Sequence, residues 1–294
     1  MTQGKILLKP GTLWAKVKQT TAHALQCRAL KSIPTEFEFI EQDGVKFLVR
    51  ILSNLNRKQA AKKKQDQQTA NTGKEFNPFL PYEEDLFVAD ISDTHICILN
   101  KFNVVDYHLL IITRAFEEQE SLLTVEDFAA MWACLADFDG LVFYNGGKIA
   151  GASQRHKHLQ ILPFSQSEIP ITPLLTTAKF QDSIGTIPGL PFLHAFTTLD
   201  LQAGVEVTFT KYQTLLAAVG IEAVGNNRQS GEYNLLATRE WMLIVPRFQE
   251  EFESISVNSL GFAGALLVRN AEQMQLLKDI GIMNVLKKVA WPMK

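Results

Sequence analysis

The sequence predicts an α+β fold made of two related halves, with an antiparallel sheet and packed helices. Short apolar segments separated by turn signals indicate strands, and stretches with apolar residues at helical spacing indicate helices. A helix followed by two strands occurs twice, at residues 123–163 and 205–247. The second occurrence also repeats short sequences of the first, because Tyr233-Asn234 matches Tyr144-Asn145 and MLIVPR matches LQILPF.

A divergent duplication explains this repetition, and chance similarity between two amphipathic hairpins is the alternative. We therefore divide the chain into a first domain at residues 1–175 and a second domain at residues 176–294.

The first domain is expected to begin with a helix and a hairpin. Residues 13–28 carry one stripe at helical spacing, formed by Leu13, Trp14, Val17, Thr21, Ala24 and Leu25. Such a stripe predicts a helix that docks on the rest of the fold. In residues 37–52 the turn signal Asp43-Gly44 separates two runs of strand-forming residues, which predicts two strands joined by a tight turn.

Residues 56–75 contain no large apolar side chain and are rich in Lys, Gln, Thr and Asn. This composition predicts a mobile loop, because the segment cannot bury a core of its own. A solvated insertion is the favoured interpretation. The alternative is a flexible lid that closes over phosphates with the basic side chains of Arg57, Lys58, Lys62, Lys63 and Lys64.

The rest of the chain is predicted to form strands and helices in turn. In the first domain the strands are residues 86–91, 95–100, 107–113, 141–145 and a segment ending at 163. The helix at residues 123–138 starts with Thr124 and Asp127 at capping-box spacing. In the second domain Gly220 is the C-cap of a helix at residues 205–220. The expected elements after it are strands at 232–238, 240–247 and 258–270, the last containing glycines, and helices at 271–281 and 282–291.

Composition and charge exclude several classes of protein. The formal net charge of -2 does not favour a nucleic-acid-binding or membrane-coating protein, since both need a strong basic excess. The three cysteines form no CxxC pair, so we expect neither a disulfide framework nor a cysteine-based zinc site. The N-terminus lacks the apolar run of a signal peptide, and no apolar run reaches the roughly 18 residues that span a bilayer. We expect a cytoplasmic protein.

The segment GASQRHKHLQILPF at residues 151–164 contains the candidate site. In a strand, His156, His158 and Gln160 would share one face. They could be ordinary hydrogen-bonding residues of a sheet surface. They could also bind zinc, but a third ligand would have to come from His95, His108, His194 or a distant carboxylate. The favoured interpretation is nucleophilic catalysis, because a neutral imidazole can attack a phosphorus atom and divide one transfer into two steps.

Small residues precede this strand. Glycine and alanine let backbone N–H groups approach an anion closely, and serine and glutamine add side-chain donors. We therefore predict a phosphate-binding loop that contains Gly147, Gly151, Ala152, Ser153 and Gln154.

The HKHLQILP segment resembles the motif of the histidine triad superfamily. Its His-x-His-x-Gln pattern is similar to that of the transferase branch that contains galactose-1-phosphate uridylyltransferase. Four longer segments, LNKFNVVDYHLLIITRAFEEQESLLT, NGGKIAGASQRHKHLQILP, YNLLATREWMLIVPR and NSLGFAGALLV, resemble the diadenosine tetraphosphate phosphorylases, or ATP adenylyltransferases, in the same order. This resemblance runs from about residue 77 to the C-terminus, and it implies a histidine-triad-like fold in both domains, with the catalytic one first.

The resemblance implies that His158 attacks the α-phosphorus of diadenosine tetraphosphate (Ap4A), releasing ATP, and that inorganic phosphate then converts the bound AMP to ADP. His156 would orient the strand or contact the phosphoryl group, and Gln160 would hydrogen-bond the transferring phosphate. The remaining substrate contacts that it implies are Asn100, Lys101, Asn145, Gly151, Ala152, Ser153, Gln154, Lys58, Asn258, Ser259 and Gly261.

Polyphosphate charge leads us to expect a divalent cation, magnesium, and no zinc. We expect neither nucleic acid nor membrane as a partner. Arg155 and Lys157 depart from the usual motif, and we expect them to change the strand entry and the surface charge. The alternatives are phosphorolysis of adenylylsulfate, hydrolysis by the same histidine, and a nucleotide sensor without turnover.

Overall fold

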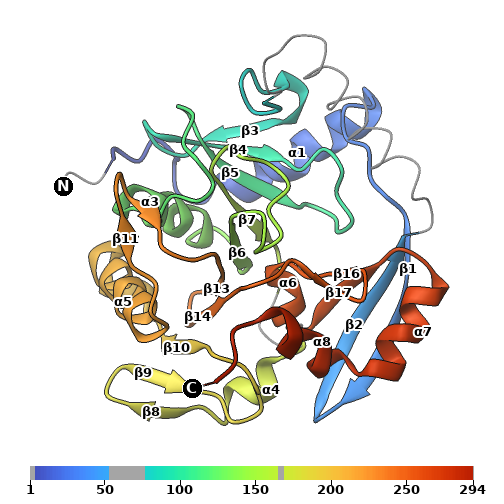
Figure 1. Ribbon diagram of the computed structural model, residues 1–294. Coiled ribbons are helices and arrows are strands. Elements are labelled where there is room, and N and C mark those ends of the chain that lie inside the picture. Colours follow the sequence, from blue (N-terminus) through green and yellow to red (C-terminus); the bar gives the residue numbers. More distant parts are fainter. Residues whose placement is uncertain (1–3, 53–76, 165–168, 294) are drawn as a thin grey trace.

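The computed structural model describes residues 4–52, 77–164 and 169–293 (Figure 1). Its centre is a ten-stranded sheet in which all neighbouring pairs are antiparallel. The strand order is β3 (Phe87–Asp90), β4 (His95–Leu99), β5 (Leu109–Thr113), β7 (His158–Leu162), β6 (Leu141–Gly146), β13 (Tyr233–Ala237), β14 (Trp241–Pro246), β10 (Ala195–Thr198), β9 (Ile184–Thr186) and β8 (Lys179–Gln181).

The sheet is continuous across both predicted domains. Its middle strands are β6 from the first domain and β13 from the second, and Asn145 lies directly opposite Asn234. The predicted pair of similar sequences, Tyr144-Asn145 and Tyr233-Asn234, therefore meets at the centre of the molecule. The predicted α+β class with an antiparallel sheet is confirmed, and the division after residue 175 stays a prediction.

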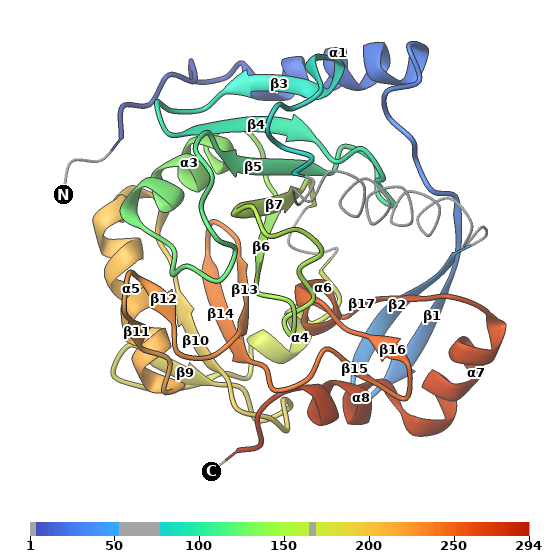
Figure 2. The ribbon, with the colours of Figure 1, turned by 45° about the horizontal axis from the view of Figure 1, so that its top comes forward.

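Three helices pack on one face of the sheet, namely α1 (Leu13–Gln26), α3 (Val125–Leu135) and α5 (Val205–Ala218). Figure 2 shows α3 and α5 side by side, with α1 next to β3. The predicted capping box of α3 is present, with Thr124 and Asp127 bonding reciprocally. In α1 the predicted stripe is buried except that Trp14 is partly buried and Leu25 is 52% exposed. Leu25 follows buried Ala24 by about 100° around the helix, and this rotation turns its side chain away from the buried face.

The other face of the sheet is covered by a second layer from both ends of the chain. The predicted hairpin around Asp43-Gly44 is confirmed as β1 (Thr35–Gln42) and β2 (Val45–Leu52), and both turn residues have positive φ. β2 pairs in parallel with β17 (Ala265–Val268). The helices of this layer are α4 (Thr172–Leu175), α6 (Ser259–Phe262), α7 (Ala271–Ile280) and α8 (Ile282–Val289).

One predicted element is partly wrong. Residues 258–270 do not form one strand, because the Asn258 side chain accepts a hydrogen bond from the Leu260 N–H and starts the short helix α6. Gly264, at φ +88°, then turns the chain into β17. The short remaining elements are η1 (Glu84–Leu86), η3 (Leu201–Ala203), β11 (Ala223–Val224), β12 (Arg228–Gln229), β15 (Glu251–Phe252) and β16 (Ile255–Ser256).

The predicted loop at 56–75, with Lys58, lies outside the described residues. Within the described residues, no helix combines the length and the apolar character needed to cross a bilayer.

Candidate active site

The histidine strand lies near the middle of the sheet, and its side chains alternate as predicted. The ring of Phe79 packs edge-on against both His156 and His158, with centroids 5.6 and 5.3 Å apart. Leu159 and Ile161 point to the opposite face and belong to the core under the helices. β7 itself begins at His158, and His156 forms a separate bridge with Glu118 just before it.

His158 is held in one tautomer. Its Nδ1–H donates to the backbone carbonyl of His156 over 2.8 Å, which leaves the lone pair on Nε2. The side chain is buried, and burial lowers the pKa of His158 to about 4. The imidazole is therefore neutral near pH 7, as a nucleophilic nitrogen must be.

His156 has partners at both ring nitrogens and is fixed by the neighbouring strand. Its Nε2–H donates to the carbonyl of Thr113 over 2.8 Å, and Nδ1 accepts from the Asn77 amide over 3.0 Å. Burial lowers the pKa of His156 as well. Because both nitrogens already have partners, His156 is suited to orienting the start of β7, which is one of the two roles predicted for it.

Gln160 is the end of a chain of side-chain hydrogen bonds. The Asn100 amide donates to Nδ1 of His108 over 3.2 Å, and Nε2–H of His108 donates to Oε1 of Gln160 over 3.0 Å. The oxygen of Gln160 is thus occupied, and the group that this side chain can offer to a phosphate is its NH2. Asn100, which the resemblance implies as a substrate contact, bonds here to His108.

Gln119 was missed by the sequence analysis. Its Oε1 accepts from the backbone N–H of His158 over 2.8 Å, while its NH2 donates to the carbonyls of His158 and Asn145 over 3.2 and 2.9 Å. β6 and β7 diverge at this point, and the Gln119 amide takes the place of a missing rung of the ladder. No local pattern could reveal this, since Gln119 is 39 residues from His158.

Lys157 is a second difference from prediction. We expected it to change the surface charge, but its side chain is buried on the helix side of the sheet. Its Nζ lies 2.6 Å from Oδ2 of Asp127, 3.2 Å from Glu117 and 3.2 Å from the carbonyl of Leu122. The reason is alternation: the residue between two histidines of one face must point to the other, where α3 provides Asp127.

Ion pairing decides the ionisation of this pair. Burial alone would lower the pKa of Lys157, but the carboxylates of Asp127 and Glu117 outweigh it and raise the pKa. Burial opposes the charge of Asp127 too, and Lys157 and His95 nevertheless keep its pKa well below the usual range. His95, which we considered as a zinc ligand, donates to Asp127 over 3.0 Å.

The small-residue loop closes largely on itself. The backbone N–H groups of Gly147, Gly151 and Ala152 donate to the carbonyls of Asn145, Lys148 and Gly147, respectively, over 2.8 to 3.0 Å. The N–H of Ala150 donates to the carboxylate of Glu232 over 3.0 Å. This loop can therefore offer a phosphate chiefly Ser153, which is exposed, and Gln154, which is half-buried.

Several predicted substrate contacts lie together at the junction of the two halves. Oδ1 of Asn145 accepts from the backbone N–H and the hydroxyl of Ser259 over 2.9 and 2.7 Å, and both side chains are buried. A Cβ added to Gly151 would lie 2.8 Å from the Cβ of Asn258, so the loop packs directly on this segment. Gly261, which is part of α6, lies against the side chain of Val257.

Lys101 lies apart from this group. Its ammonium group pairs with the carboxylate of Glu83, and both side chains are partly exposed.

The arrangement defines a class of protein. A neutral, oriented histidine, with an amide two residues further along the same face, is suited to transferring a nucleotidyl group through a covalent histidine intermediate. Comparison with known proteins places the chain more narrowly. Residues 3–177 match the family model of the Ap4A phosphorylase N-terminal domain, and residues 188–292 match that of the ATP adenylyltransferase C-terminal domain. The chain belongs to the Ap4A phosphorylase family.

Individual relatives agree with this assignment. The chain is 28% identical over 246 residues to diadenosine 5',5'''-P1,P4-tetraphosphate phosphorylase 2 of Saccharomyces cerevisiae, covering 74% of this chain and 76% of the relative. It is 29% identical over 213 residues to protein APA1 of the same organism, covering 62% and 66%. The crystal structure of yeast Ap4A phosphorylase Apa2 in complex with Ap4A has a TM-score of 0.79 at 23% identity, covering 97% of this chain and 99% of that one.

Proposed function

We propose that this protein catalyses the phosphorolysis of Ap4A to ADP and ATP through an AMP–histidine intermediate at His158. The observation that supports it most directly is the state of the ring, neutral and donating from Nδ1, on a chain of this family. In the first step Nε2 attacks the α-phosphorus, the bond from that phosphorus to the bridging oxygen breaks, and ATP leaves. In the second, an oxygen of inorganic phosphate attacks the same phosphorus, the P–N bond breaks, and ADP leaves.

The surroundings of the ring support both steps. When Nε2 becomes bonded to phosphorus, the imidazole gains positive charge, and the bond from Nδ1–H to the His156 carbonyl becomes stronger. The His108 bond to Gln160 leaves the amide NH2 of Gln160 as the donor to the phosphoryl oxygens. A polyphosphate leaving group needs little protonation, so an amide that cannot give up a proton suffices.

The other proposed substrate contacts are those that the family resemblance implies. They are Asn100, Lys101, Asn145, Gly151, Ala152, Ser153, Gln154, Asn258, Ser259, Gly261 and Lys58. We propose magnesium as the cation. In the part of the chain that the structure describes, His, Cys, Asp and Glu side chains form one group of three or more that is close enough to share an ion, around His23 on α1. Magnesium would therefore be held by the substrate phosphates. We further propose a cytoplasmic enzyme that binds neither nucleic acid nor membranes.

The test is to incubate the protein with Ap4A and magnesium, with and without inorganic phosphate, and to measure nucleotides by chromatography and the intact protein by mass spectrometry. We expect ADP and ATP in equal amounts only with phosphate, and an AMP-sized adduct without it. His158→Ala should remove both adduct and turnover while the fold stays intact. Gln26→Ala, at an exposed position on α1, is the control and should keep both.

Each other outcome contradicts a named part of the proposal. AMP and ATP without phosphate would identify a hydrolase. Faster turnover with sulfate than with phosphate, or with adenylylsulfate than with Ap4A, would identify adenylylsulfate as the compound on which the enzyme acts. Tight binding without turnover would identify a sensor, and turnover by His158→Ala near that of the parent protein would exclude this nucleophile.

A further inference from the structure

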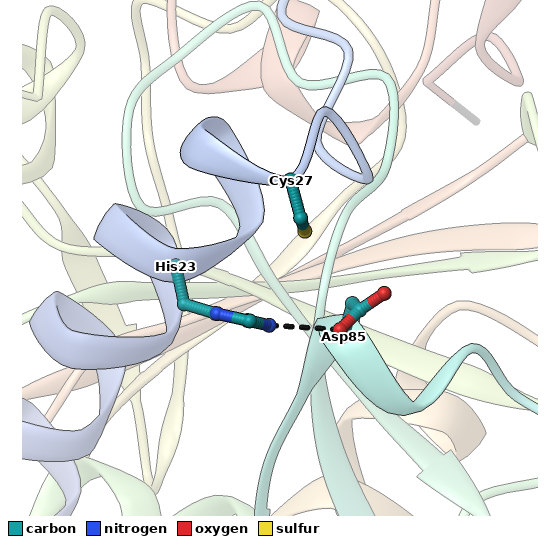
Figure 3. Close-up of side chains that lie close together, drawn as sticks. All are labelled: His23, Cys27 and Asp85. Atoms are coloured by element: carbon teal, nitrogen blue, oxygen red, sulfur yellow. Dashed lines mark hydrogen bonds and ion pairs between the residues drawn. The ribbon is translucent and has the colours of Figure 1, made fainter.

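Three side chains of types that bind transition metals meet at the end of α1, away from the histidine strand. They are His23 and Cys27 of the last helical turn and its cap, and Asp85 of η1 (Figure 3). Nε2 of His23 and Oδ1 of Asp85 are 2.8 Å apart, and one ligand atom from each of the three residues lies within 4.8 Å of the others. All three residues are exposed, so an ion in solution can reach them.

The fold holds this group together from both sides. His23 and Cys27 are four residues apart, so they project from the same side of α1. The helix is anchored on the sheet by Leu13, Val17 and Ala24, and the Thr20 hydroxyl donates to the carbonyl of Phe87 over 3.3 Å. η1 leads directly into β3 at Phe87, which fixes Asp85 opposite the helix end.

The distances suit a tetrahedral ion after a small movement. Zinc binds Cys, His and carboxylate ligands at about 2.0–2.3 Å, which puts the ligand atoms roughly 3.3–3.8 Å apart. Separations of up to 4.8 Å thus have to shorten by about an ångström, and the 2.8 Å between His23 and Asp85 has to lengthen by about half an ångström, which exposed side chains can do by small rotations. A water molecule would complete the four ligands on the solvent side.

The surroundings favour a cation. His23 and Cys27 lie at the C-terminal end of α1, where the last carbonyls and the helix dipole are negative. Glu84, beside Asp85, is exposed and adds a further negative charge. A thiolate and an imidazole select zinc-like ions over magnesium and calcium, which prefer oxygen ligands.

We propose that His23, Cys27 and Asp85 bind one zinc ion, and that this ion ties the end of α1 to η1. The absence of paired cysteines from the sequence led us to expect no zinc. Asp85 is 62 residues from His23, so the group exists only in the folded chain.

The experiment titrates the full-length, metal-free protein, kept reduced with a phosphine, with Co2+ as a spectroscopic probe and then with Zn2+. We expect one equivalent of Co2+ to produce a thiolate-to-cobalt charge-transfer band and the strong visible bands of a four-coordinate ion, both displaced by Zn2+. Cys27→Ser and His23→Ala should each weaken binding by roughly 100-fold or more and remove or shift these bands. Gln26→Ala, an exposed neighbour on the same helix, should bind like the parent protein.

Thiol reactivity and melting give independent readouts. Cys27 is the exposed cysteine, and Cys97 and Cys134 are buried, so a thiol reagent added to the folded protein reports on Cys27. Zinc should slow this reaction at least about tenfold and raise the Tm of the parent protein but not of His23→Ala. The proposal is wrong if no charge-transfer band forms, if Cys27→Ser binds Co2+ as tightly as the parent, or if zinc leaves the thiol equally reactive.

Discussion

At the scale of single residues, the site depends on the ionisation of His158. The side chain is buried beside Phe79 and donates from Nδ1 to a carbonyl, so the protein stabilises its neutral form. This gives Nε2 its lone pair at neutral pH. It also carries a cost under acid conditions, because an unfolded chain can protonate the same ring freely.

We predict that His158 makes the free energy of unfolding fall as the pH drops below neutral. Burial lowers the pKa of His158 to about 4, against about 6.5 in an unfolded chain, so between these values the unfolded state binds the extra proton. The stabilisation is complete above about pH 6.5 and is lost towards pH 4. Between pH 7 and pH 5 the loss from this residue should be about 2 kcal/mol.

The measurement compares urea unfolding of the parent protein and His158→Asn at both pH values. The other titrating groups contribute equally to both proteins, so the parent should lose more stability than the variant. Equal losses would mean that His158 titrates near its ordinary pKa in the folded state.

At the scale of elements, a buried ion pair on the helix side of the sheet fixes the start of β7. The Nζ of Lys157 makes three bonds, and its Asp127 partner belongs to the capping box that starts α3. The catalytic strand and the first turn of α3 thus share one buried ion pair. His95 of β4 donates to the same carboxylate and links a third element.

Removing this ion pair from one side should be costly. We predict that Lys157→Met lowers the free energy of unfolding by about 3 kcal/mol, because it leaves the buried carboxylate of Asp127 without its cation. Lys278→Met is the matched control. Lys278 pairs with Glu38 at 2.7 Å but is 34% exposed, so its loss should cost less than about 1 kcal/mol.

Urea unfolding midpoints measure both variants. A loss for Lys157→Met no larger than that of Lys278→Met would show that the buried pair does not hold the strand. The double variant Lys157→Met with Asp127→Asn should regain part of the loss, since it removes the unpaired charge.

At the scale of the whole molecule, a buried polar cluster joins the two halves. Asn234 donates to Asn145 and Ser259 over 3.0 and 2.9 Å, and its own oxygen accepts from the guanidinium of Arg247 over 2.5 Å. Arg247 is 2% exposed and also donates to the carbonyls of Val257, Gln249, Glu250 and Val289. Burial lowers the pKa of Arg247 to about 9, which still leaves it charged at neutral pH.

Because one sheet and this cluster cross the predicted domain boundary, the protein should unfold in a single transition. We predict that Arg247→Met lowers the free energy of unfolding by about 3 kcal/mol by leaving several buried acceptors unpaired, and that it shifts the whole transition. Arg228→Met is the control, since Arg228 pairs with Glu120 at 67% exposure. Calorimetry and urea unfolding followed by two probes measure this. A transition that splits in two would show that the halves fold independently.

Local patterns were enough to predict most elements correctly. The capping box of Thr124 and Asp127, the tight turn at Asp43-Gly44 and the alternation of the histidine strand each depend on neighbours in sequence. The strand predicted at residues 258–270 is present only as β17, because the apolar run could not show that the Asn258 side chain would bond to Leu260 and start a helix. Leu25 was assigned to the buried stripe of α1, but its side chain is 52% exposed.

The sequence by itself determined the chemistry that the histidine strand can perform, since period-two alternation places His156, His158 and Gln160 on one face wherever the strand lies. It also determined the family, because the motif and its flanking segments are continuous in the chain. Only the tertiary structure decided which nitrogen of His158 keeps its lone pair, that Gln119 bridges β6 and β7, and that Lys157 lies buried on Asp127. The Gln119 and Lys157 contacts join residues 26 to 39 positions apart, and the bond that sets the tautomer of His158 depends on the backbone geometry at His156, so no pattern of neighbours encodes them.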